Sequence, residues 1–344
     1  MRSGTVKKLQ NQPQQSDFFL QRKKALIVKP ETKPLSGYKF IDLFAGIGGI
    51  RLPFDELGAE CVFSSEWDKF SQVTYAANYG TTPHGDITKI EATEIPSFDI
   101  LLAGFPCQPF SNAGHKKGFE DARGTLFFDI CRIADYHKPK ILLLENVKGF
   151  KSHNQGNTFE VVKQTLRNLG YILHAQVLNS KHFGVPQNRE RIYIIAFREN
   201  LNFEFPKPHF RETCVGSILD KNVPEKYTLS DKLWQGHQKR KAEHMRKGNG
   251  FGYSLFNKDS TYTSTISARY YKDGSEILIE QLGKNPRKLT PREAARLQGL
   301  PEDFIIPVSD VQAYKQFGNS VSVPVIRELA HEICKAILEK ENED

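Results

Sequence analysis

The sequence has no long hydrophobic run, and its amino terminus has no apolar stretch. No segment approaches the roughly eighteen consecutive apolar residues that a transmembrane helix needs. The opening residues MRSGTVKKLQNQPQQSDFFLQRKK lack the hydrophobic centre of a secretory signal. We therefore expect a soluble, intracellular protein. Of its 344 residues 39% are hydrophobic, enough for a sizeable core in one or two domains.

Cysteine is scarce, and its spacing excludes two classes of small scaffold. The five cysteines are odd in number and never form a CxxC pair. This pattern argues against a disulfide framework and against a zinc site, so we expect free thiols in a reducing compartment and no bound metal.

The net charge of +8 is concentrated in two segments. Residues 1–36 hold eight basic and two acidic side chains, and residues 206–309 hold eighteen basic and twelve acidic ones. Such segments favour a polyanionic partner, most plausibly nucleic acid. Solvated surface charge without a partner is the alternative, and charge alone does not separate the two.

The order of apolar runs predicts the fold class. Residues 1–36 have the composition of a basic, disordered arm. Short apolar runs then alternate with amphipathic stretches, which indicates a Rossmann-like α/β fold whose mixed, mainly parallel sheet has helices on both faces. After about residue 205, prolines and glycines interrupt every pattern. We expect a discontinuous catalytic and cofactor-binding domain of residues 37–205 and 310–344, closed by a helix in VSVPVIRELAHEICKAILEK, and a smaller irregular domain of residues 206–309.

A glycine-rich turn follows the first predicted strand. The glycines of FAGIGG let the backbone approach a ligand closely, and Glu66, about twenty residues further on, can accept hydrogen bonds from ribose hydroxyls. Trp67 can stack on an adenine ring, and Asp86 can accept its exocyclic amine. The turn lacks the Lys and Ser/Thr pair of a triphosphate site. An adenosine cofactor therefore fits better than ATP, although such glycines can also be purely structural.

Cys107 lies in GFPCQPFS, directly after the predicted strand FDILLAG. This places it at the carboxyl edge of the sheet, where open α/β sheets bind ligands. Most single cysteines are inert core residues. Here Pro106 and Pro109 fix the local backbone, which suits a rigidly presented side chain. A thiol is only slightly ionised at neutral pH, so nearby positive charge would be needed to make it an efficient nucleophile.

Two further polar groups are expected at the same edge. Glu145 and Asn146 end the apolar run ILLLENV, and a carboxylate in that position is costly unless it is paired or functional. Arg189 and Arg191 alternate in a strand-like segment and so share one face. They can hold the thiolate, the carboxylate or a phosphate; an ordinary surface ion pair is the alternative.

Taken in order, GFPCQPFS, LLLENV, QNRERIY, KLTPREAARLQGLP and QFGNSV resemble the bacterial DNA (cytosine-5)-methyltransferase family. FIDLFAGIGG is similar to the S-adenosylmethionine loop of that family, and the likeness covers residues 37–344. The resemblance implies methyl transfer from S-adenosylmethionine to C5 of cytosine in a short double-stranded DNA sequence, in a restriction-modification or Dcm-like system. It also implies a monomer, and a cognate restriction endonuclease that acts separately. No metal is needed.

The resemblance assigns roles to the residues already singled out. Cys107 is the nucleophile that adds to C6 of a cytosine flipped out of the duplex, because C5 alone is too electron-poor to attack the methyl group. Glu145 holds and protonates N3, Asn146 helps to fix the base, and Arg189 and Arg191 match the active-site arginines. The segment SNAGHKKGFEDARGT matches a mobile loop that closes over DNA. Residues matched to the cofactor site are Phe44, Gly46, Gly48, Glu66, Trp67, Asp86, Ile87, Gly104, Leu126, Asn319 and Ser320.

Target recognition belongs to the smaller domain by the same resemblance. RKGNGFGYSLF and TISARYYKDGSEIL are similar to methylases of CCGG or CCNGG-type sites. Arginine and lysine suit guanine edges and phosphates. The candidate DNA-reading residues are Lys247, Tyr253, Arg269, Tyr270, Tyr271 and Lys272. A solvated hairpin is the alternative for each of them. The arm of residues 1–36 has no counterpart; it either adds nonspecific DNA affinity or has no role.

Three other functions are compatible with parts of the pattern. An RNA cytosine-5 methyltransferase would share the chemistry, but the long basic variable domain favours DNA. A catalytically idle DNA-binding protein or repressor would be expected to have lost Cys107 or Glu145, and both are present. A nicotinamide dehydrogenase would explain the glycines and Glu66 but not the cysteine or the paired arginines.

Overall fold

The chain folds around a mixed six-stranded sheet. A computed structural model describes residues 33–106, 126–209, 212–250 and 252–343. The strand order is β2-β1-β3-β4-β6-β5. β1 to β4 run parallel, and β6 runs antiparallel to both of its neighbours. The strands are β1 (Lys39–Leu43), β2 (Glu60–Ser65), β3 (Ile100–Gly104), β4 (Ile141–Val147), β5 (Ile172–Asn179) and β6 (Glu190–Phe197). Each predicted strand is present, and the mainly parallel α/β class is confirmed.

Alternating side chains of the central strands build two separate cores. On β3, Ile100 and Leu102 belong to one apolar cluster, whereas Leu101 and Ala103 belong to the other. The period of two along a strand sends successive side chains to opposite faces. Continuous apolar runs such as ILLL therefore form where helices cover both faces. The edge strand β5 is an exception, since it is half-exposed along most of its length.

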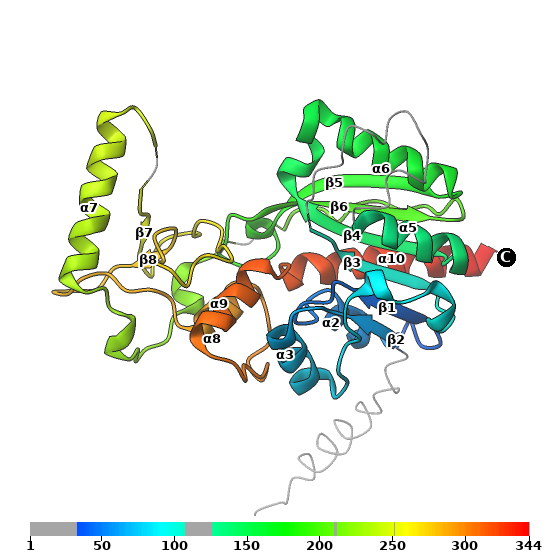
Figure 1. Cartoon of the computed structure of the whole chain (residues 1–344), viewed down its shortest axis with the longest axis horizontal. Coiled ribbons are helices and arrows are strands. Elements are labelled where there is room, and N and C mark those ends of the chain that lie inside the picture. The colour runs from blue at the N-terminus through cyan, green and yellow to red at the C-terminus, as the bar shows by residue number, and fades with distance from the viewer. Residues whose placement is uncertain (1–32, 107–125, 210–211, 251, 344) are drawn as a thin grey trace, which may run out of the picture.

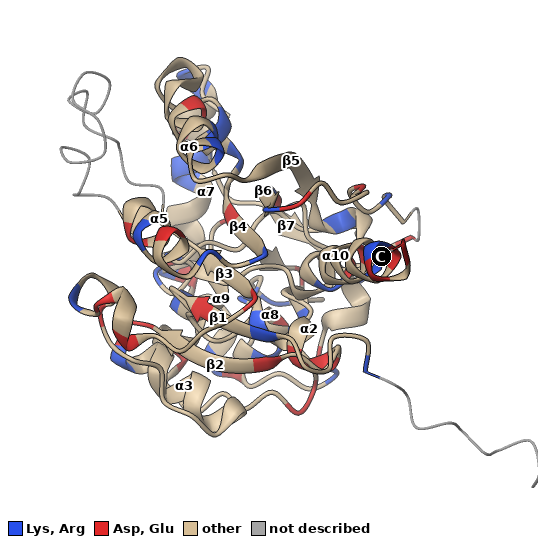
Figure 2. Ribbon diagram, turned by 90° about the vertical axis from the view of Figure 1, so that its right-hand side faces the viewer, with Lys and Arg blue, Asp and Glu red and all other residues tan. Residues whose placement is uncertain are grey.

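Helices cover the two faces of the sheet, as Figure 2 shows in a view along it. α2 (Arg51–Glu56) and α10 (Val323–Glu343) pack on one face, and α5 (Leu126–His137) and α6 (Asn157–Asn168) pack on the other. α3 (Lys69–Tyr79) follows β2; its first turn is capped by the Asp68 carboxylate, which accepts from Ser71 N at 2.8 Å. The closing helix expected in the carboxyl-terminal segment is α10. It returns to the core and contacts α2.

The smaller part of the molecule stands to one side of the sheet and is mostly irregular (Figure 1). Its elements are α7 (Asp231–Arg246), the short strands β7 (Leu255–Phe256) and β8 (Leu278–Ile279), and α8 (Pro291–Leu297). A third apolar cluster holds it together and includes Ala313, Tyr314 and Phe317 of α9 (Asp310–Asn319). We therefore propose that the smaller domain extends through α9, ten residues beyond the limit expected from composition.

The end of the predicted arm belongs to the folded body. Leu35 is fully buried in the core beneath α2, and its amide donates to the Leu57 carbonyl at 2.9 Å. Residues 1–32 lie outside the described part of the chain, so the remainder of that prediction is untested. No helix in the described ranges is long and apolar enough to cross a membrane.

Candidate active site

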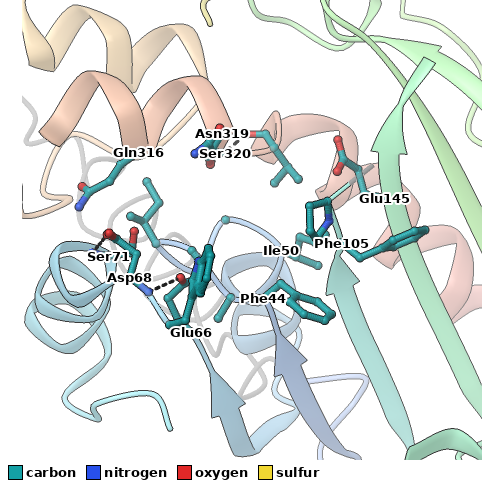
Figure 3. A pocket seen from close by; sticks show the side chains of 18 of the residues that line it. Phe44, Ile50, Glu66, Asp68, Ser71, Phe105, Glu145, Gln316, Asn319 and Ser320 are labelled. Carbon is teal, nitrogen blue, oxygen red and sulfur yellow. Dashed lines mark hydrogen bonds between the residues drawn. The ribbon is translucent and has the colours of Figure 1, made fainter. Parts of the chain in front are cut away.

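A pocket of about 790 Å³ opens at the carboxyl ends of β1 to β4. Figure 3 shows Glu145 and Phe105 toward one end, Gln316, Asp68 and Ser71 toward the other, and Glu66 between them. Its volume is typical of a site for a small molecule or cofactor. Fourteen of the catalytic and cofactor-binding residues predicted from the sequence line this pocket. They are Phe44, Gly46, Glu66, Trp67, Asp86, Ile87, Gly104, Leu126, Glu145, Asn146, Arg189, Arg191, Asn319 and Ser320.

The glycine turn is shaped by close contact with α3. Gly46 and Gly48 have positive φ angles of 56° and 82°, which favour glycine. A Cβ atom on Gly48 would lie only 2.2 Å from the Tyr79 ring, and the Tyr79 hydroxyl donates to the Gly48 carbonyl at 2.7 Å. Gly48 is therefore required by both its backbone angle and its neighbour. Gly48 was also predicted as a cofactor residue. It does not line the pocket itself, but it is the chain neighbour of Gly49, which does.

Glu66 fixes the glycine turn as well as lining the pocket. One carboxylate oxygen accepts from Gly46 N and the other from Asp68 N, both at 2.8 Å. Burial raises the pKa of Glu66, and the two backbone hydrogen bonds oppose the rise. Each oxygen retains a lone pair that can accept from a ligand. The neighbouring Trp67 is 80% exposed, an unusual state for an indole that leaves one face open to a flat ligand.

Glu145 is held at the end of β4 by Arg191 of the antiparallel neighbour β6. Arg191 Nε lies 3.1 Å from Glu145 Oε1. Burial raises the pKa of Glu145, and the positive charges of Arg191 and Arg189 oppose this effect. The sequence left a thiolate, a carboxylate and a phosphate as possible partners of the two arginines. Arg191 is paired with the carboxylate. The arrangement gives a carboxyl group that keeps its proton at higher pH than an exposed glutamate does.

Asn146 braces the neighbouring strand end. Its amide nitrogen donates to the Phe105 carbonyl at 2.9 Å, and its amide oxygen accepts from Val147 N at 2.8 Å. The side chain is almost fully buried. Asn146 therefore ties the end of β4 to the segment that follows β3. Both the nitrogen and the oxygen of its side-chain amide already have backbone partners.

Arg189 differs in environment from Arg191. Its guanidinium donates to the carbonyls of Ile266, Gly318 and Ser320, at 3.2, 3.1 and 2.6 Å respectively. Only 1% of the residue is exposed, and burial lowers the pKa of Arg189 to about 9. It joins the start of β6 to the smaller domain and to the end of α9. This set of partners makes Arg189 a positioning residue.

The predicted nucleophile Cys107 and the predicted closing loop SNAGHKKGFEDARGT fall outside the described residues. Pro106, which precedes Cys107 in the sequence, lines the pocket. The four described cysteines are free thiols: Cys131 and Cys334 are buried, Cys61 is half-buried, and Cys214 is exposed.

Comparison with known proteins identifies the family. Residues 38–335 match the family described as C-5 cytosine-specific DNA methylase. The chain belongs to that family. The predicted resemblance and the predicted enzyme class, a DNA cytosine methyltransferase, are therefore confirmed.

Individual relatives agree with this assignment. The chain is 59% identical to the Type II methyltransferase M.SsoII of Shigella sonnei over 91% of its own length and 86% of that protein. It is 60% identical to the Type II methyltransferase M.NlaX of Neisseria lactamica, covering 87% of the chain and 97% of the relative. Among solved structures, the Entamoeba histolytica methyltransferase EhMeth has the same fold, with a TM-score of 0.72 at 22% identity over 87% of this chain and 98% of that one.

The candidate DNA-reading residues of this C-5 cytosine methylase occupy different environments. Arg269, Lys272 and Lys247 are exposed. Tyr271 is half-buried, with Lys315 Nζ 5.2 Å from its ring centroid. Tyr253 packs against α7, its ring centroid 4.6 Å from that of Trp234.

The assignment of Tyr270 to DNA reading was wrong. Its side chain is fully buried, its hydroxyl donates to the Ile277 carbonyl at 2.7 Å, and it accepts from Leu289 N at 2.7 Å. A fully buried ring with both hydrogen bonds made inside the protein has no surface left for a base. Tyr270 is instead a core residue of the smaller domain.

Sequence reasoning missed several residues of the site, and Tyr79 and Gln316 are the most informative of them. Tyr79 supports the glycine turn, and Gln316 lines the far end of the pocket. Gln316 is part of the quoted segment QFGNSV, but only Asn319 and Ser320 were singled out there. Nothing in the local sequence of Tyr79 marks it, because its role depends on a glycine thirty-one residues earlier in the chain.

Proposed function

We propose that this C-5 cytosine methylase binds S-adenosylmethionine in the pocket and methylates C5 of a cytosine flipped out of duplex DNA, through a covalent bond between Cys107 and C6. The observation that carries the proposal is the ion pair of buried Glu145 with half-buried Arg191, in the same pocket as the glycine turn, Glu66 and Trp67. A carboxyl group with a raised pKa and an adenosine-type site adjoin there. The chemistry of this family needs both.

The residues present fit the cofactor. Trp67 offers an open ring face for adenine, and Glu66 has acceptor capacity for ribose hydroxyls. Asp86 accepts from Thr88 N and Oγ1 through a single oxygen, Oδ1, which leaves Oδ2 available to an exocyclic amine. Bound S-adenosylmethionine would supply a methyl group activated by its positively charged sulfur.

The protein's own groups would carry the remaining chemistry. The Cys107 thiolate adds to C6 of the cytosine while Glu145 delivers its proton to N3, so the electron pair displaced from the C5–C6 double bond makes C5 nucleophilic. C5 would take the methyl group that the bound cofactor supplies, and the cofactor sulfur would be left as a neutral sulfide. Water takes the C5 proton, the C5–H electron pair re-forms the C5–C6 double bond, the Cys107 sulfur leaves as a thiolate, and the N3 proton returns to Glu145. Base flipping is required because a stacked cytosine cannot reach a pocket at the strand ends.

The biological role follows the names of the relatives, which are Type II methyltransferases. We infer that the chain is the methylase of a restriction-modification system, that its substrate is double-stranded DNA, and that a separate endonuclease recognises the same sequence. We further propose a CC-containing site of the CCGG or CCNGG type, read by residues of the smaller domain.

A covalent trap tests the proposal. Plasmid DNA is first methylated with tritiated S-adenosylmethionine, and bisulfite sequencing identifies the modified cytosine. A duplex carrying 5-fluorocytosine at that position is then incubated with the full chain. Because the fluorine cannot leave as a proton does, the enzyme should remain attached to DNA on a denaturing gel.

The controls separate the catalytic cysteine from other thiols. Cys107→Ser should abolish the trapped complex, whereas Cys214→Ser, which alters an exposed cysteine of the smaller domain, should retain it. A trapped complex with Cys107→Ser would disprove the assignment of the nucleophile. Incorporation of tritium into transfer RNA but not into duplex DNA would favour the RNA methyltransferase instead.

A further inference from the structure

One polar face of α9 forms a wall of the pocket. Gln312, Lys315, Gln316 and Asn319 recur at helical spacing, and all four line the pocket. Gln316 differs from the others because it is only 5% exposed. It is thus a buried amide at the boundary of a ligand site.

The amide of Gln316 is fixed from one side only. The hydroxyl of Thr74, a fully buried residue of α3, donates to Gln316 Oε1 at 3.0 Å. Gln316 Nε2 is buried and has no hydrogen-bond partner among the described residues. A buried donor without a partner is costly, and a water, an ion or a ligand that accepts its hydrogen bond removes the cost. Gln316 Nε2 is therefore an unused hydrogen-bond donor in the wall of the pocket, between α9 and α3.

The charges around the pocket indicate which acceptor this is. The carboxylates of Glu66, Asp68 and Asp86 line the same pocket, whereas Lys315 of α9 and Arg191 are among its positive side chains. S-adenosylmethionine carries two positive groups, the sulfonium and the ammonium, and a single negative one, the carboxylate. The acidic wall suits the positive groups, so the cofactor carboxylate needs a donor from elsewhere in the wall.

Two backbone donors of the glycine turn are already engaged. Gly46 N donates to Glu66 Oε2 at 2.8 Å, and Gly48 N donates to the Ala45 carbonyl at 2.8 Å. Gln316 lies one helical turn before Ser320 and on the same helix as Asn319, and all three residues line the pocket. The NH₂ group of Gln316 is thus a donor in the α9 wall of the pocket that no described residue uses.

We propose that Gln316 is a cofactor-binding residue whose NH₂ group donates to the α-carboxylate of S-adenosylmethionine, and that Thr74 is the positioning residue that orients it. This inference rests on the proposed function, because it assumes that the pocket binds S-adenosylmethionine. It adds a contact that distinguishes the amino-acid part of the cofactor from its adenosine part.

The test compares three ligands by calorimetry on the full chain. S-adenosylhomocysteine has the complete amino-acid tail, its decarboxylated analogue keeps the ammonium but lacks the carboxylate, and 5′-methylthioadenosine lacks both. The protein variants are Gln316→Leu, Gln316→Glu and Thr74→Val, with Thr74→Ser as the matched control that keeps the hydroxyl.

The expected pattern depends on the carboxylate. Gln316→Leu should weaken S-adenosylhomocysteine binding about tenfold, the effect of one hydrogen bond to a charged group. It should leave the affinities of the other two ligands within about twofold of their wild-type values, because neither ligand has the carboxylate that Gln316 contacts. Gln316→Glu should reverse the preference and bind the decarboxylated analogue more tightly than S-adenosylhomocysteine, since like charges repel and the remaining ammonium is attracted. Thr74→Val should weaken S-adenosylhomocysteine alone, and Thr74→Ser should not.

Other patterns would overturn the inference. Equal losses for all three ligands would show that Gln316 only maintains the shape of the pocket, and unchanged binding of S-adenosylhomocysteine would show that it makes no contact. If Gln316→Leu does not fold, two other comparisons still test the inference. They are Thr74→Val against Thr74→Ser, and the wild-type affinities for S-adenosylhomocysteine and its decarboxylated analogue. Should wild type bind none of the three, the proposed function itself would fail.

Discussion

Arg191 Nε lies 3.1 Å from Glu145 Oε1, and this pair closes one end of a pocket whose other end is formed by α3 and α9. Burial raises the pKa of Glu145, and the arginine charge limits the rise. A carboxyl group in this state keeps a proton that it can donate at higher pH than an exposed glutamate can, and it can take the proton back. The pair therefore links β4 to β6 and, under the proposed function, also sets the acidity of the catalytic carboxyl group.

Glu145→Gln should remove methyl transfer while leaving duplex binding intact. The amide fills the same space and can still donate a hydrogen bond, but it has no transferable proton. We expect single-turnover methylation to fall by about 10²- to 10⁴-fold, the usual contribution of an acid–base group. Glu190→Gln, at the exposed ion pair with Lys148, is the control and should be nearly as active as wild type. A Glu145→Gln rate close to wild type would contradict the assignment.

Arg191→Met should move the pH dependence of methylation in a defined direction. In the proposed mechanism Glu145 acts in its protonated form, so activity should fall as the pH rises through its pKa. Removing the positive charge that lowers this pKa must raise it further. The alkaline limb of the single-turnover rate should therefore shift to higher pH, whatever the loss in absolute rate. A shift to lower pH would mean that another group sets the limb.

The sheet and the strand-end residues were predictable because they depend on local patterns. An apolar run such as ILLL that ends in Glu145 and Asn146 places both groups at a sheet edge without any tertiary information. The partners of those groups were not predictable. Arg189 and Arg191 alternate in the sequence, yet Arg189 precedes β6 and binds carbonyls of two distant segments, whereas Arg191 lies within β6 and faces Glu145.

Burial in the smaller domain was less predictable still. Tyr270 and Tyr271 are adjacent in a polar, basic segment with turn residues on either side. Tyr270 is buried because Leu289 and Tyr314, from later segments, surround it. No pattern within the segment distinguishes the two rings, since their environments are set by contacts at long sequence separation.

Arg189→Met should destabilise the protein strongly. The substitution leaves the carbonyls of Ile266, Gly318 and Ser320 without their shared donor, at a cost of about 3 kcal/mol or more in the free energy of unfolding. Urea unfolding followed by circular dichroism measures this loss. Lys148→Met removes an exposed ion pair instead and should cost less than about 1 kcal/mol. Similar losses for the two variants would contradict the positioning role of Arg189.

Trp67→Ala should weaken cofactor binding without affecting stability. The indole is 80% exposed, so its removal costs little packing, but a stacked base should lose roughly tenfold or more in affinity. The chain has two tryptophans, and Trp234→Phe leaves Trp67 as the sole indole reporter. Binding of S-adenosylhomocysteine should quench the fluorescence of Trp234→Phe and leave that of Trp67→Ala nearly unchanged. Quenching in Trp67→Ala instead would place the adenine away from this ring.

Arg269→Ala and Lys272→Ala should weaken duplex binding by removing exposed positive charge. If each contacts a phosphate, the slope of the logarithm of affinity against that of salt concentration should fall by about one per residue. A contact to a guanine edge would instead weaken the target duplex more than a scrambled one. Lys284→Ala, which alters an exposed lysine paired with Glu225, is the control and should change neither quantity.

Tyr270→Ala should lower stability by about 3 kcal/mol or more, because it removes a fully buried aromatic ring. Fluorescence anisotropy over a salt series, with thermal melts of each variant, separates the two kinds of effect. Unchanged affinity and salt slope for both Arg269→Ala and Lys272→Ala would exclude this segment from the DNA interface.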